Sequence, residues 1–440
     1  MVGIGNRKRR GRTGREEPLA FPSAEDAQRD AVIARLFDGV LRSARSQLLK
    51  TESPLAAEVW GSGLMAVWDG LPAGSGDHEP FPSGGTSDSA GAFAEALVRH
   101  AAELRTPEGM AVLAALASVA PARVATRART AAAELEQSGI AAPGWAAVAG
   151  TSVPTEAWIG SDVYGDQEIV IVGFVYPTLP DTGSNGDGGH SICVLVDHTE
   201  RGIAKDAYPA APLAQTLARW REAEGDGIAL RPASLPEVAA RLADALLATD
   251  FVNDTPRTEG RTLAEIRALL AARLATLPPA AATGVEELDS DGRDWLVAEF
   301  LGAPEAADLL SEPAAVTVCH SLIAYRCDYG DGDALRWSPT LVGLCLLDHF
   351  PVKVSLDGPD LALVPDVLAA WVAFSARRRH LPEPALARIL DVIDSCRADF
   401  PVVMGDVARY SPAKRAAMDM LNRGIDLTED HAWAEAVGRN

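Results

Sequence analysis

The stretch of residues 189–206, in which glycines flank the apolar run 191–198, constrains the fold of this chain more than any other segment. Its first part, 191–198, is rich in Val, Ile and Leu, which favours a β-strand. The next four residues, 199–202, suit a tight turn because they end in a glycine, which readily takes the left-handed conformation. The stretch therefore predicts an antiparallel hairpin, and with it a small sheet in the middle of the chain.

The predicted hairpin gathers ionisable side chains close to its turn. Because side chains alternate along a strand, closing the four-residue turn puts His198 and Lys205 on one face. Asp197 and Asp206 then share the other face. Diagonal neighbours in such a ladder lie about 7–8 Å apart, close enough to flank one water or ligand group. We take His198, Lys205 and Asp206 as candidate catalytic residues; the simpler interpretation is a hairpin end whose polar residues are solvated or cap the turn.

A histidine that acts as general base needs a carboxylate to orient it. Asp197 is next to His198 in sequence but points to the opposite face, so we expect that carboxylate to be Asp162 or Asp166. His190 shares the face of His198, yet eight residues of straight strand separate them by roughly 26 Å. That separation excludes a metal site made of His190, Asp197 and His198, and we expect no metal and no cofactor. Asp162, Asp166, His190 and Asp197 form the candidate accessory site.

Other motifs of known chemistry are absent. The chain has no GxGxxG, Walker, HExxH, GxSxG or CxxC pattern. The glycine loop 181–189 joins two strands, whereas a phosphate-binding loop joins a strand to a helix, so nucleotide binding there is disfavoured. Residues 328–333 include acids at positions 328, 331 and 333, which resembles the start of a calcium loop, but the terminal Glu is missing and Ser338 is better explained as a helix cap. The five cysteines, an odd number, are expected to be free and shielded thiols.

Charge is distributed unevenly along the chain. Residues 1–15 contain no acid and six basic side chains, which leaves 34 of the 40 basic residues against all 61 acidic ones in the rest of the chain. The acidic body disfavours binding to nucleic acid or an anionic membrane. Nucleic acid or an acidic partner is therefore expected to contact only the basic arm, through Arg7, Lys8, Arg9, Arg10, Arg12 and Arg15. The arm could equally be a solubilising tail or contact the acidic body itself.

Periodicity divides the chain into four parts. We predict a disordered basic arm at 1–22, a helical domain at 23–145, an α+β module with the hairpin at 146–260, and a second helical domain at 261–440. The fold class is therefore α+β and predominantly α-helical, with helical N- and C-terminal regions flanking a small antiparallel-sheet module. A Gly/Ser/Pro-rich segment at 72–90 is predicted to be a flexible loop.

Localisation and partners follow from composition alone. No apolar run approaches the ~20 residues of a membrane span, and no secretory signal follows the basic arm. We therefore expect a soluble, cytoplasmic protein that does not bind membranes. Its partner is expected to be another protein, and its oligomeric state stays open.

Several strings give the chain a family resemblance. They are Trp337-Ser338-Pro339, the segment 363–371, the hairpin residues 197–206 and the segment 54–58. Over most of its length the chain resembles uncharacterised actinobacterial proteins of similar length, a family with no established activity, so the resemblance carries over no catalytic residues.

Two functions remain in view. The first is a non-catalytic interaction or regulatory protein that acts through its helical surfaces. The second is a hydrolase or transferase with a site at the 190–206 hairpin. A tight, apolar-walled pocket beneath His198 and Lys205 would favour the enzyme, whereas an open and solvated hairpin would favour the interaction protein.

Overall fold

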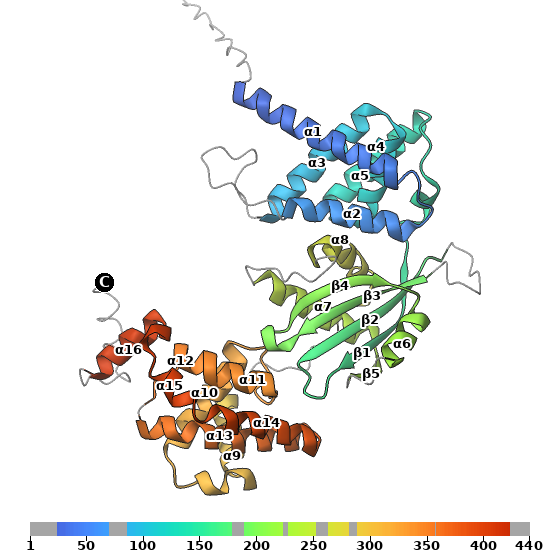
Figure 1. Cartoon of the computed structure of the whole chain (residues 1–440). Coiled ribbons are helices and arrows are strands. Elements are labelled where there is room, and N and C mark those ends of the chain that lie inside the picture. Colours follow the sequence, from blue (N-terminus) through green and yellow to red (C-terminus); the bar gives the residue numbers. More distant parts are fainter. Residues whose placement is uncertain are drawn as a thin grey trace, which may run out of the picture.

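The structure is a computed structural model that describes residues 24–69, 86–177, 189–222, 228–251, 263–280, 288–356 and 358–422. The basic arm, residues 181–188 of the glycine loop and most of the predicted 72–90 loop lie outside these ranges. Within them, three groups of elements follow one another in space: a helical group, a sheet with its own helices, and a second helical group (Figure 1). No helix among the described residues is long and apolar enough to cross a membrane.

The N-terminal group is a set of five α-helices around one apolar core. They are α1 (Ala24–Gln47), α2 (Pro54–Asp69), α3 (Thr86–Leu104), α4 (Pro107–Val119) and α5 (Ala122–Gln137). Helix α4 begins at Pro107, because Thr106 accepts a hydrogen bond from Gly109 N and Pro107 occupies the first helical position. Phe37, Leu97 and Leu113 are buried in this core, and a short 3₁₀ turn, η1 (Gly144–Ala147), adds the buried Trp145.

The middle of the chain forms a five-stranded antiparallel sheet of order β4-β3-β2-β1-β5. Its strands are β1 (Val153–Ser161), β2 (Gln167–Val175), β3 (Gly189–Asp197), β4 (Ile203–Ala210) and β5 (Ala229–Ala233). The sequence did not predict β1. Its burial does not follow a regular alternation, because its first four residues are not buried and only three of its nine are. Strand β1 therefore has neither a continuous apolar run nor a two-residue alternation, and these are the patterns that predict a strand from sequence.

Helices cover both faces of this sheet. Helix α7 (Leu235–Asp250) and helix α8 (Leu263–Leu274) pack on the face that carries Val172 and Val194. Helix α6 (Leu213–Glu222) packs on the opposite face, against Ile171 and Cys193. Because both sides of β2 and β3 are buried, these strands read as continuous apolar runs. The predicted boundary at 260/261 separates α8 from the core into which it packs.

The C-terminal group is again helical. It contains α9 (Ser290–Leu301), the 3₁₀ turn η4 (Pro304–Leu309), α10 (Ala314–Asp328), α11 (Pro339–Gly343), the π-helical turn η5 (Leu344–His349), α12 (Phe350–Lys353), α13 (Gly358–Arg378), α14 (Glu383–Cys396), α15 (Phe400–Met404), η6 (Val407–Arg409) and α16 (Pro412–Asn422). Ser338 caps α11 as predicted, since it accepts a hydrogen bond from Leu341 N. The aromatic rings of Phe300, Trp371 and Phe374 meet in the core of this group. A predominantly helical α+β fold is thus confirmed.

Candidate functional site

The hairpin forms, but its register differs from the prediction. Asp197 pairs with Ile203, Leu195 pairs with Asp206, and a β-bulge lies between these two pairs, at Lys205. The turn is one residue longer than predicted, because His198 leaves the strand and begins a short 3₁₀ turn, η2 (His198–Glu200), so that residues 198–202 lie between the paired Asp197 and Ile203. One extra residue in a strand breaks the two-residue alternation of side chains. The prediction that His198 and Lys205 share a face is therefore wrong.

Lys205 instead contacts Asp197. Its Nζ lies 2.6 Å from Asp197 Oδ2, and the carboxylate is 2% exposed. Thr199 donates two further hydrogen bonds to Asp197 Oδ1, from its backbone nitrogen at 3.0 Å and its hydroxyl at 2.6 Å. Burial alone would raise the pKa of Asp197, but hydrogen bonds from Lys205, Thr199 and Gln167 outweigh burial and lower that pKa. The charges of Lys205 and Asp197 therefore balance each other within the hairpin.

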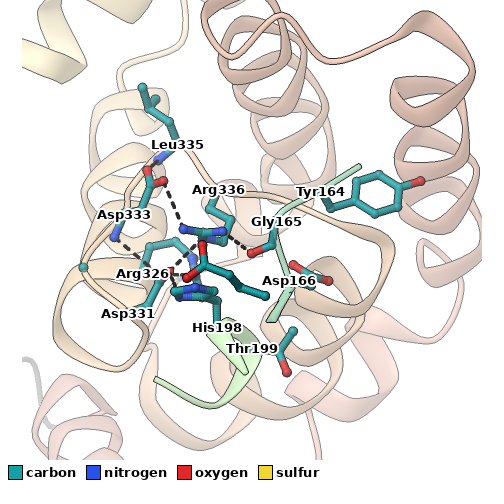
Figure 2. A network of polar contacts seen from close by, with 12 residues as sticks. Tyr164, Gly165, Asp166, His198, Thr199, Arg326, Asp331, Asp333, Leu335 and Arg336 are labelled. Carbon is teal, nitrogen blue, oxygen red and sulfur yellow. Dashed lines mark hydrogen bonds and ion pairs between the residues drawn. The ribbon is translucent and has the colours of Figure 1, made fainter. Parts of the chain in front are cut away.

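His198 points into the joint between the sheet and the C-terminal helices (Figure 2). Its Nδ1 lies 3.3 Å from Asp331 Oδ2, and its Nε2 is buried without a hydrogen-bond partner among the described residues. Asp331 also pairs with Arg326 and, at 2.7 Å, with Nε of Arg336. Burial would raise the pKa of Asp331, yet His198 and the two guanidinium groups lower it to about 2. Arg336 also donates to the carbonyl of Gly165.

The carboxylate beside His198 is thus Asp331, and the prediction that Asp162 or Asp166 would orient it is wrong. Asp162 is used by its own loop, where its two oxygens accept four backbone N–H groups, from Tyr164, Gly165, Asp166 and Gln167, at 2.7–3.1 Å. The signal that could have identified Asp331 is the group of acids at positions 328, 331 and 333, which was compared only with a calcium loop. Nothing in the sequence indicates that this segment meets the hairpin.

Asp166 is different, because its carboxyl is only partly engaged. It is 7% exposed, and its Oδ1 has no hydrogen-bond partner among the described residues. Burial raises its pKa, while a hydrogen bond with Ser338 and the charges of Arg336 and Arg326 act in the opposite direction. Figure 2 shows its carboxyl pointing away from the contacts that His198 makes with Asp331.

The remaining two candidates lie apart from these groups. Asp206 accepts a hydrogen bond from the neighbouring Ala207 N at 2.8 Å, a local contact within β4. His190 is buried on the face that packs against α8, where Arg273 Nε donates to its Nε2 at 3.2 Å. Burial and the charge of Arg273 lower the pKa of His190 to about 3, so the ring is neutral. His190 and His198 therefore make their contacts in different parts of the fold.

Arg273 belongs to a second buried polar cluster. Its guanidinium pairs with Glu58 of α2 and donates to the hydroxyl of Tyr176 at 3.1 Å. Glu58 also accepts from Tyr176 at 2.6 Å and from Gly150 N at 2.6 Å. The side chains of Glu58 and Arg273 are 0% and 2% exposed. The cluster therefore ties α2, α8 and the end of β2 together, and the sequence analysis did not identify it.

An open cleft lies beside the hairpin. It has a volume of about 640 Å³ and is lined by Asp162, Val163, Tyr164, Asp166, Gln167, Asp197, Thr199, Glu200, Lys205, Thr340 and Arg388. Four of the candidate residues, Asp162, Asp166, Asp197 and Lys205, therefore share one concave surface. His198, His190 and Asp206 are not among its lining residues.

Neither a metal-binding cluster among the described residues nor a similar known protein identifies this site. Among the described residues, no three His, Cys, Asp or Glu side chains are arranged so as to hold a metal ion. Comparisons of the chain with protein-family models, with curated proteins and with solved structures find no match.

Proposed function

We propose that this chain is a non-catalytic cytoplasmic protein that binds another protein through its helical surfaces. The observation that supports this most directly is that the ionisable side chains of the hairpin are engaged within the chain. His198 faces Asp331, Lys205 faces Asp197, and the oxygens of Asp162 accept backbone hydrogen bonds. A general base must reach a proton on its substrate, and an imidazole whose two ring nitrogens are buried in an internal joint does not.

The hydrolase or transferase alternative needs a different geometry. It requires His198 to face a closed, apolar-walled pocket together with Lys205. The cleft beside the hairpin is instead open and rich in charged side chains, and its lining includes Lys205 but not His198. The arrangement therefore favours binding over catalysis.

The surface formed by α9 and α10 is where we place the partner. Trp295 on α9 is 63% exposed, Leu310 is 69% exposed and Val316 on α10 is 40% exposed. The two helices are joined by an ion pair between Asp294 and His320 at 3.4 Å. Single exposed apolar residues are common, but tryptophan is enriched among the residues that dominate binding energies at interfaces. Trp295 is therefore the first position to test.

The test is affinity purification of the full chain from its native host, with and without nuclease, followed by direct binding measurements with the purified partner. We expect a nuclease-resistant protein partner whose affinity falls at least tenfold on Trp295→Ser. Val402→Ser is the matched control, because Val402 is 72% exposed on α15. Equal affinity of the Trp295 variant and the wild type would contradict the assigned surface. A partner lost on nuclease treatment would contradict protein binding and favour nucleic acid on the basic arm.

A further inference from the structure

The cleft beside the hairpin is large enough to be a binding site. It lies between the loop that joins β1 to β2, the turn of the hairpin, and two C-terminal helices that contribute Thr340 and Arg388. Its volume of about 640 Å³ falls within the roughly 300–1,000 Å³ that is usual for ligand sites. Its walls carry four acidic and two basic side chains.

Several of the charged groups on these walls are already engaged within the chain. The carboxylate of Asp162 accepts four backbone hydrogen bonds, and Asp197 forms an ion pair with Lys205 at 2.6 Å. These groups are therefore not free to take a ligand. The acidic side chains that stay available to a ligand are Asp166 and Glu200.

Asp166 distinguishes this cleft from a cluster of acidic side chains on the surface, because its side chain is buried. It is more than nine-tenths buried, and Oδ1 of its carboxyl lacks any hydrogen-bond partner in the described part of the chain. A buried carboxylate with an unsatisfied oxygen costs free energy, which a cationic hydrogen-bond donor would offset. Burial raises the pKa of this carboxyl, as expected for an anion whose counter-charge is incomplete.

We propose that the cleft binds an ammonium or guanidinium group, with Asp166 as the principal anionic contact and Glu200 as the second. The source of that group is a Lys or Arg side chain of the partner protein, a step that rests on the proposed function. Thr199 and Thr340 supply neutral polar groups on the wall. A metal ion fits less well, because the oxygens of Asp162 and Asp197 are already occupied and too few hard donors remain.

Arg388 gives the proposal its sharpest test. Its guanidinium lies over the ring of Tyr164, 5.8 Å from the centroid, and contributes positive charge to the wall. If the cleft binds cations, removing this charge should leave binding unchanged or strengthen it. If the cleft binds anions, the same change should abolish binding. The direction in which removal of the Arg388 charge changes affinity therefore distinguishes cation binding from anion binding.

The experiment uses the full chain and calorimetric titration with four probes: Nα-acetyl-lysine N-methylamide, its arginine counterpart, spermidine, and the uncharged Nα-acetyl-norleucine N-methylamide. We expect the first two to bind, the norleucine probe not to bind, and Asp166→Asn to weaken binding at least tenfold. The amide introduced by Asp166→Asn keeps an oxygen that can accept from Ser338. Arg388→Gln should bind at least as tightly as the wild type, and Asp308→Asn, on the exposed surface, should bind like the wild type.

Three results would overturn the proposal: equal binding of the norleucine probe, unchanged affinity in Asp166→Asn, or loss of binding in Arg388→Gln. Binding of spermidine without the two amino-acid probes would contradict a side chain of a partner as the source. If Asp166→Asn fails to fold, Glu200→Gln and Arg388→Gln decide the question, with weaker and unchanged-or-tighter binding expected respectively. Failure of the proposed function would be seen separately, if no protein partner is found whose affinity depends on Trp295.

Discussion

Asp331 is a carboxylate surrounded by two guanidinium groups and an imidazole. Arg326, Arg336 and His198 all contact it, and its side chain is 5% exposed while that of Arg326 is 1% exposed. Taking such charges out of water is costly, and the cost is offset only while every partner is present. Asp331 therefore has a structural role, and we expect its replacement to lower the stability of the fold rather than to change a reaction.

Replacing Asp331 by Asn should therefore destabilise the chain by about 3–5 kcal/mol at neutral pH, since two buried guanidinium groups lose their counter-charge. The pKa of Asp331 is lowered from 3.8 to about 2, so its stabilisation is complete above the unfolded value and is lost as pH falls through 2. Denaturant melts at pH 7, 4 and 2.5 should show the difference from wild type shrinking in acid. Asp308→Asn should stay within about 0.5 kcal/mol at pH 7. A difference that does not depend on pH would contradict this account.

The five cysteines allow a second prediction at this scale. All five are free; Cys193, Cys319, Cys345 and Cys396 are buried and Cys327 is partly exposed. Burial raises the pKa of Cys193 and of Cys319 to about 12, so neither is a thiolate at neutral pH. A thiol reagent should label native protein slowly, with Cys327 first, and denatured protein completely. Peptide mapping that finds Cys193 labelled before Cys327 would contradict the structure.

At the scale of elements, the sequence predicts best where local chemistry decides. The cap at Ser338 and the hairpin itself depend on neighbouring residues, and they were predicted. The bulge at Lys205 was not, because β3 is apolar on both faces and its pattern cannot fix a register. The contact of His198 with Asp331 joins segments far apart in the sequence, and no local signal encodes it. The candidate residues at the hairpin could thus be named from sequence, but their partners could not.

Helix α8 offers the clearest prediction at this scale. Arg273→Met should lower the free energy of unfolding by about 3–5 kcal/mol, because Glu58 would stay buried without a counter-charge. Adding Glu58→Gln should restore part of that loss, since the uncompensated charge is then gone. Arg267→Met on the same helix breaks an exposed pair with Asp250 and should cost no more than about 1 kcal/mol. Denaturant melts of the wild type and these three variants measure this, and equal losses for Arg267 and Arg273 would contradict the role of burial.

Over the whole molecule, the sheet is joined to its two helical neighbours by different chemistry. On the N-terminal side, a buried ion pair combines with apolar packing of α2 against α8. On the C-terminal side, the loops at 162–166 and 198–202 contact the helices largely through polar and charged groups, including Arg201 Nε, which donates to Tyr329 O at 3.2 Å, while Tyr164 packs against the C-terminal core. Polar interfaces between parts of a chain commonly permit relative motion. We therefore expect the C-terminal joint to open more readily than the N-terminal one.

Arg336 is the residue through which this difference can be tested. It contacts both Asp331 and the carbonyl of Gly165, so it links the C-terminal helices to the sheet. Arg336→Met should speed hydrogen exchange in the loops 162–166 and 198–202 at least tenfold, because opening of the joint then requires fewer broken contacts. Exchange in α4, within the N-terminal core, should stay unchanged. Arg377→Met, which breaks an exposed pair with Glu305, is the control and should leave both loops as they are. Faster exchange throughout the chain would mean that the substitution lowers global stability, and unchanged exchange in the two loops would show that Arg336 does not hold the joint closed.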